Sequence, residues 1–140
     1  MPWQDPSGSF IVTKKFDDPL QGGCDSCIFI AGLSSYAWTN LSIFPPPKTK
    51  DASNYYTFNF YPGGVTKTVK VSQKLCIENG VPKFASSSEA NELWPSLYEK
   101  AYAAFINAGR TSVTVDTFVM GSVPFGKNGD VTMQDLANMP

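Results

Sequence analysis

Residues 91–109, NELWPSLYEKAYAAFINAG, give the strongest secondary-structure signal in the chain and decide its fold class. Apolar side chains recur at helical intervals along one face of this stretch: Leu93, Leu97, Ala101, Ala104, Phe105 and Ala108. Pro95 suits the first turn of a helix, where no intrahelical donor is required, and Gly109 suits its C-terminal end. The stretch therefore predicts an amphipathic helix that packs one face against a core.

Strand signals lie between this helix and an earlier one. The alternating stretch YYTFNFY (55–61) and the stretch VTKTVKV (65–71) flank the turn PGG (62–64), which predicts an antiparallel hairpin. We expect three aromatic residues of the first strand to share its buried face: Tyr56, Phe58 and Phe60. Another helix is predicted to begin at Cys27, with these apolar residues on the same face as that cysteine: Ile30, Ala31, Leu33 and Ala37. The order of elements indicates an α+β fold.

Length and composition narrow the class of protein. The 140 residues suffice for one small domain, and a hydrophobic fraction of 42% excludes a disordered chain. A net charge of -1 without a basic block argues against nucleic acid or an anionic membrane as partner. No apolar run approaches the ~20 residues that span a bilayer, and the N-terminus lacks the pattern of a signal peptide. We therefore expect a cytoplasmic protein.

Two cysteines lie three positions apart in QGGCDSC (21–27), just ahead of the first predicted helix. A structural zinc site needs four ligands, and only Cys76 remains in a chain that contains no histidine, so zinc is disfavoured. A redox pair of the thioredoxin type would follow a strand, whereas the preceding segment (14–23) has the composition of a loop. Redox chemistry at Cys24 and Cys27 stays open as an alternative.

A third hypothesis makes Cys27 a nucleophile. The positive end of the helix macrodipole and the free N–H groups of a helix N-terminus favour the reactive thiolate. The side-chain amide of Gln21 would be able to donate to an oxyanion. Buried cysteines that only fill a core are the plainer alternative for Cys24 and Cys27.

Two segments resemble the calpain-type, papain-like cysteine proteases. Gln21, Gly22 and Cys27 match the nucleophile segment, and residues 86–105 resemble the later helix of the family through this series: Trp94, Leu97, Glu99, Lys100, Ala101, Tyr102 and Ala103. The resemblance covers about residues 5–121, is strongest over 18–38 and 84–109, and corresponds to the first catalytic subdomain. It implies that residues 1–140 are one partial domain, the nucleophile-bearing half of a papain-like fold whose central helix starts at Cys27.

By the same resemblance, Cys27 is the nucleophile and Gln21 the oxyanion donor. Asp18 and Glu92 fall where the family places two carboxylate ligands of calcium, an ion that takes several oxygen ligands. Backbone carbonyls of FIVTKKF (10–16) would be able to add to them. The chain departs from the family around the nucleophile, where it has three other residues: Asp25, Ser26 and Ile28. Asp25 in particular places a negative charge where a thiolate must form, and so opposes it.

The absent histidine limits what this chain is expected to do alone. Papain-like catalysis uses a histidine as base and acid and an asparagine that orients it, and the family carries both on its second subdomain. We therefore expect a calpain-like endopeptidase half-domain that is inactive alone, acts on protein or peptide substrates, and needs a second chain or C-terminal half bearing His and Asn. The alternatives are a non-catalytic binding or decoy module and a small thiol redox protein.

Overall fold

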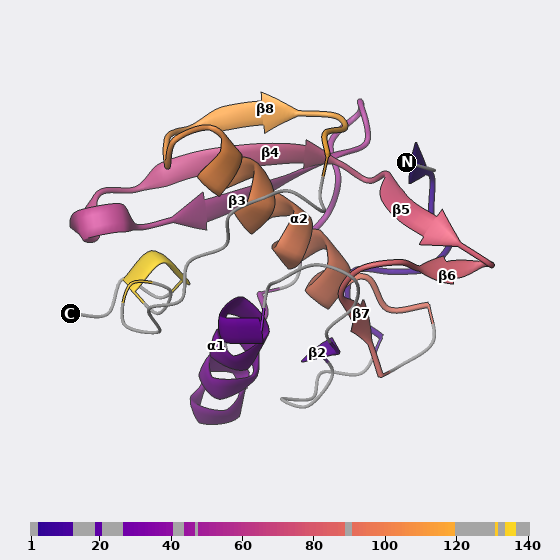
Figure 1. Ribbon diagram of the computed structural model, residues 1–140, viewed down its shortest axis with the longest axis horizontal. Helices are drawn as coiled ribbons and strands as arrows, with labels where there is room; N and C mark the ends of the chain where they lie inside the picture. Colours follow the sequence, from indigo (N-terminus) through magenta and orange to yellow (C-terminus); the bar gives the residue numbers. More distant parts are fainter. Residues whose placement is uncertain are drawn as a thin grey trace.

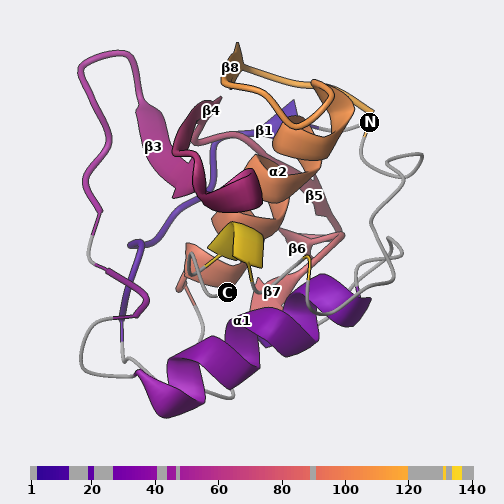
Figure 2. The same ribbon diagram turned by 90° about the vertical axis from the view of Figure 1, so that its left-hand side faces the viewer.

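The computed structural model describes residues 3–12, 19–20, 27–40, 44–46, 48–88, 91–119, 131 and 134–136. They form a mixed α+β structure in layers (Figures 1 and 2). Helix α2 (Trp94–Asn107) runs through the middle, with a three-stranded sheet on one side and helix α1 (Cys27–Thr39) on the other. None of the helices in this part of the chain is long and apolar enough to cross a membrane.

The three-stranded sheet confirms the predicted hairpin. Strands β3 (Tyr55–Phe60) and β4 (Lys67–Ser72) pair antiparallel around the short 3-10 turn η1 (Pro62–Gly64). Every second residue of β3 is buried, as its alternation predicted: Tyr56, Phe58 and Phe60. A third strand, β8 (Val113–Val115), pairs parallel to β4 and was not predicted from the sequence.

Short strands form two further sheets, both smaller than the β3-β4-β8 sheet. Strands β1 (Trp3–Gln4), β5 (Leu75–Glu78) and β6 (Val81–Pro82) lie in the order β1-β5-β6, close to the N-terminus in Figure 1. Strand β2 (Pro19–Leu20) pairs antiparallel with β7 (Ser86–Ser87). Of the segment 10–16, whose carbonyls were expected to add to the calcium ligands, the residues from 13 onward lie outside the described part of the chain.

Helix α2 corrects the amphipathic prediction. It is buried on every side, without interruption from Trp94 to Phe105. The sheet covers one side and α1 lies against the other, so no face is left for solvent. The cap signals were correct: Pro95 lies in the first turn, and Gly109 follows the helix with φ of 72°, in the left-handed region that suits glycine.

Helix α1 begins at Cys27 as predicted, but it lies at the edge of the layers, and α2 takes the central place. Its buried residues are Phe29, Ile30, Gly32, Leu33 and Ala37. Cys27 and Ala31, which were expected on the buried face, are both exposed. They are one helical turn apart, so they share one stripe, and in this structure that stripe points away from α2.

Asp135 lies close to the C-terminal part of α2. Asp135 is completely buried, and its carboxylate accepts hydrogen bonds from the Tyr102 hydroxyl at 2.6 Å and from Arg110 Nη2 at 2.5 Å. The backbone N–H of Tyr61, beside η1, donates to the Asp135 carbonyl at 2.8 Å. This residue therefore ties the β3–β4 turn to the C-terminal end of α2.

Lys100 makes a similar tie in the middle of α2. The residue is 1% exposed, and its ammonium group donates to three acceptors at 2.8–2.9 Å: Ser72 O, Ser72 Oγ and Lys74 O. It also lies 5.0 Å from the centre of the Trp3 ring. Burial lowers the pKa of Lys100 to about 7, although the Asp116 carboxylate nearby opposes that shift.

We predict that Tyr102→Phe lowers the free energy of unfolding by about 1–3 kcal/mol, because it removes a buried donor to a charged carboxylate. Urea denaturation measures the loss. Tyr55→Phe, at a half-buried position on β3, is the matched control and should change stability by less than about 0.5 kcal/mol. Equal effects of the two substitutions would contradict the role given to the Tyr102–Asp135 pair.

A second prediction follows from Lys100. Between pH 7 and about 10 the unfolded chain binds a proton that the folded chain has released, so stability should rise with pH. Relative to Lys100→Met, the wild type should gain up to about 1.4 kcal/mol per pH unit in this window, and nothing below it. Denaturation from pH 6 to 9.5, with Cys76→Ala in both proteins to remove the thiol's titration, measures this. A flat difference would show that the three acceptors keep the ammonium group charged.

Candidate functional site

Cys27 is the first residue of α1, and its free thiol is exposed. Two residues later, the Phe29 ring stacks on the Tyr102 ring of α2, with centroids 4.4 Å apart and planes 7° from parallel. Leu33 and Ala37 continue the buried side of the helix. The start of α1 is thus anchored to the core through Phe29, while the thiol faces solvent.

The position of Cys27 suits a nucleophile. The first turn of an α-helix presents backbone N–H groups without intrahelical partners, and these favour negative charge on a neighbouring thiol. Exposure gives an electrophile access to the sulfur. Gln21, Cys24, Asp25 and Ser26 lie outside the described residues, so their predicted roles remain predictions.

The chain upstream of Cys27 is held by β2. In this two-residue strand Pro19 pairs with Ser87 and Leu20 with Ser86. Helix α1 and α2 both contact β2. The predicted calcium ligand Asp18 precedes β2 directly and is itself outside the described residues.

Glu92, the other predicted calcium ligand, is a buried carboxylate beside this strand pair. Its Oε2 accepts from the Val12 backbone N–H at 2.6 Å, and its Oε1 accepts from the Ser87 hydroxyl at 2.6 Å. Both carboxylate oxygens thus accept hydrogen bonds from other segments of the chain. Glu92 also lines an open groove of about 450 Å³ together with Ser86, Ser87 and Asn91, which gives an ion access from solvent.

The strand register brings the neighbourhood of Asp18 to Glu92. Ser87 is opposite Pro19 in the β2–β7 pair, and the same serine donates to Glu92. Pro19, the residue next to Asp18 in the sequence, is therefore opposite the serine whose hydroxyl donates to the Glu92 carboxylate. Among the residues that the structure describes, no group of three or more His, Cys, Asp or Glu side chains gathers as a metal site. A calcium ion here would thus need Asp18 and backbone carbonyls in addition to Glu92.

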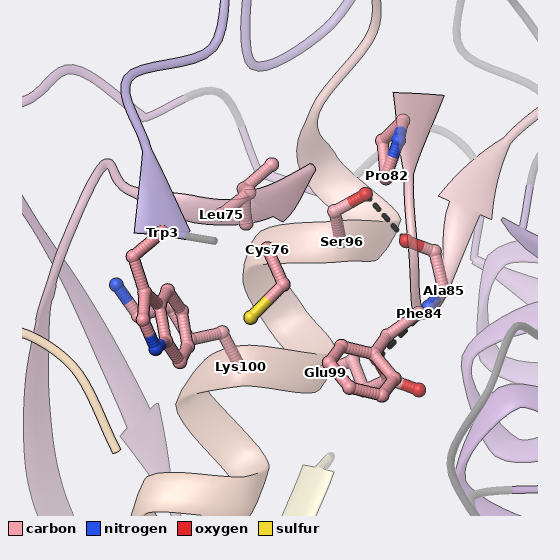
Figure 3. A pocket seen from close by; sticks show the side chains of 9 residues that line it. All are labelled: Trp3, Leu75, Cys76, Pro82, Phe84, Ala85, Ser96, Glu99 and Lys100. Carbon is pink, nitrogen blue, oxygen red and sulfur yellow. Dashed lines mark hydrogen bonds between the residues drawn. The ribbon is translucent and has the colours of Figure 1, made fainter. Parts of the chain in front are cut away.

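A second cysteine lies in a separate pocket between β1, β5, β6 and α2. Figure 3 shows Cys76 there with Trp3, Glu99 and Lys100 around it. The cavity is about 10 Å³, which is at most the room of one water molecule, so it does not serve as a substrate site. Burial raises the pKa of the Cys76 thiol, although the Lys100 charge opposes this, and the thiol is correspondingly inert.

Sequence reasoning missed three polar residues that connect these parts. Ser87 bonds Glu92, while Ser96 and Glu99 of α2 bond the backbone of Ala85, just ahead of β7. One signal was available. Polar residues at positions 96, 99 and 100 interrupt the apolar pattern of α2 on more than one side, which in a helix buried all round means buried polar partners.

Comparison with known proteins covers this region. The family described as calpain family cysteine protease matches residues 3–120. Calpain-8 of Rattus norvegicus is 32% identical over 104 residues, which cover 70% of this chain and 15% of that protein. Calpain-5 of Mus musculus is 30% identical over 138 residues, with 86% of this chain and 21% of that protein covered. Calpain clp-1 of Caenorhabditis elegans is 25% identical over 119 residues, which cover 77% of this chain and 15% of that protein.

The chain thus spans about a fifth or less of the length of these relatives. The matched residues include Cys27 at the start of α1, the β2–β7 pair beside it, Glu92 and the whole of α2. With most of its length matched by one family, the chain belongs to the calpain family of cysteine proteases.

Proposed function

We propose that this chain is the nucleophile-bearing first half of a calpain-type, papain-like endopeptidase domain, with Cys27 as nucleophile and Gln21 as oxyanion donor. The observation that carries the proposal is the exposed Cys27 thiol at the first residue of a helix inside the family match. In peptide hydrolysis the Cys27 thiolate would attack the scissile carbonyl. Before the attack, the N-terminus of α1 would stabilise the negative charge of the thiolate.

The second half of the reaction needs a group that these 140 residues lack. Expulsion of the amine requires a positioned proton donor near neutral pH, and the chain has no histidine. The required histidine and its asparagine would have to come from outside this sequence. Such a partner would fit the exposed stripe of α1, where Trp38 is 69% exposed on the same side of the helix as Cys27 and Ala31.

Calcium is the cofactor proposed for this half, at Glu92 and Asp18. Support comes from the buried Glu92 carboxylate on an open groove and from the pairing of Pro19 with Ser87, which brings the Asp18 region close. Two carboxylates with backbone carbonyls supply the oxygen ligands that calcium prefers. When bound, the ion would neutralise two acidic groups and thereby fix the β2–β7 pair on which Ser87 lies.

We predict that the 140-residue chain does not hydrolyse peptides at a useful rate, with or without calcium. General acid–base help is typically worth 10²–10⁴-fold, and no other residue provides it here. Iodoacetamide should nevertheless label Cys27, because alkylation needs only thiolate and access. A fluorogenic peptide assay and peptide mapping of the labelled chain measure both, with Cys27→Ala as control.

The outcomes separate the candidate functions. Peptide cleavage by the chain alone that disappears in Cys27→Ala would refute the half-enzyme. Turnover restored by a second polypeptide bearing the His and Asn half would support it. Tight binding of such a half without turnover would favour the non-catalytic binding module.

We predict that calcium raises the melting temperature of the chain, since an ion that binds only the folded state stabilises it by about 2.7 kcal/mol at 100 times its dissociation constant. The shift should vanish in Asp18→Asn and in Glu92→Gln. Glu78→Gln is the matched control, because Glu78, the last residue of β5, is an exposed acid that forms an ion pair with Lys83. A shift that persists in both ligand variants, or none at millimolar calcium, would contradict this site.

A further inference from the structure

Ala85 is held by α2 through both of its backbone polar groups. The Ser96 hydroxyl donates to the Ala85 carbonyl at 2.6 Å, and the Ala85 N–H donates to Glu99 Oε1 at 2.9 Å (Figure 3). The three residues are 1–4% exposed, so water does not substitute for either bond. Two side chains one helical turn apart thus fix a single peptide on the helix surface.

The use of a glutamate here needs an explanation. A carboxylate buried to this extent is costly unless it is hydrogen-bonded, and an apolar residue would fill the same space without that cost. A hydrogen bond from a backbone N–H to an ionised carboxylate is roughly twice as strong as one to a neutral acceptor. Glu99 therefore favours a fixed position of Ala85 over maximal packing energy.

The position of Ala85 matters because β7 starts at the next residue. The β2–β7 pair has only two residues on each strand, which is too short to hold itself in place. Strand β7 contacts α2, and the fixed Ala85 peptide is its upstream attachment. Strand β2 in turn takes its register from β7, with Leu20 opposite Ser86.

From β2 the constraint reaches the thiol. Strand β2 contacts α1, and Cys27 is the first residue of that helix. The helix start is attached to the core from its other side by the stack of Phe29 on Tyr102. The direction of the Cys27 thiol thus depends on two attachments to α2, one through Phe29 and one through Ala85, β7 and β2.

We propose that Glu99 and Ser96 are positioning residues for the Cys27 nucleophile, acting through Ala85 and the β2–β7 pair. The role of Cys27 itself rests on the proposed function. The two residues touch neither substrate nor sulfur. Their effect is to hold the strand pair that supports the start of α1.

Hydrogen exchange of the 140-residue chain tests the structural step. Ser96→Ala and Glu99→Leu should speed exchange of the Leu20, Ser86 and Ser87 amides by roughly two- to tenfold at a temperature where the chain stays folded, the size that one buried hydrogen bond supports. Glu99→Gln keeps an acceptor oxygen and should restore protection. Ser72→Ala is the matched control, since its buried hydroxyl also donates to a backbone carbonyl, that of Asp116, and accepts from the Lys100 ammonium group rather than bonding to β7.

The pH profile of Cys27 alkylation tests the functional step. In Ser96→Ala and Glu99→Leu the midpoint and rate should move toward the values of the chain unfolded in urea, while Ser72→Ala keeps the wild-type profile. Unchanged exchange at β2 and β7, or equal changes in Ser72→Ala, would overturn the positioning role. A wild-type thiol that already reacts like the unfolded chain would instead refute the nucleophile, and the exchange result would still decide the role of Glu99 and Ser96 at the strand pair.

Discussion

A helix without a solvent-facing side is the constraint on which this structure depends. Because α2 is buried from Trp94 to Phe105, polar side chains on that stretch need partners inside the protein, and among the described residues the buried Trp94 Nε1 is the exception that has none. Ser96 and Glu99 bond the backbone of Ala85, and Lys100 bonds that of Ser72 and Lys74. The paths of the connecting segments around the helix are therefore determined by the positions of polar residues along it.

The two chemically interesting groups are both connected to the same small strand pair. Glu92 accepts from the hydroxyl of Ser87 on β7, while β2 contacts α1, the helix that begins at Cys27. A displacement of β7 would therefore alter the surroundings of both the buried Glu92 carboxylate and the Cys27 thiol. The pair has two residues on each strand, so its geometry is imposed by its neighbours and has little stiffness of its own.

The sequence predicted the elements whose signals are local. The alternation of Tyr56, Phe58 and Phe60 gave the hairpin, and the start of α1 at Cys27 followed from the change to helical spacing. What it missed depends on tertiary contacts. A three-residue strand such as β8 carries too little pattern, and the solvent side of Ala31 and Cys27 is set by where α2 lies.

The candidate site also combines residues that the sequence identified with residues that it did not. Cys27 and Glu92 could be named from family resemblance, and both lie in the described structure at a helix start and a buried groove wall. The supporting residues Ser87, Ser96 and Glu99 could not be assigned partners from sequence, since their bonds join segments that are brought together only by folding. Buried hydrogen bonds between distant segments leave no periodic trace in a sequence.

The hydrogen bonds of Asp135 affect the order in which parts of the chain can fold during synthesis. The family match stops at residue 120, yet the Tyr102 hydroxyl at the heart of α2 is bonded to a carboxylate 33 positions later. Parallel pairing of β8 with β4 likewise waits for α2 and the loops before it. Contacts of this sequence separation form slowly, and a ribosome that delivers about 5–20 residues per second withholds the last of them for seconds. Until then the Tyr102 hydroxyl lacks its Asp135 acceptor, although the stacked Phe29 ring already covers the Tyr102 ring.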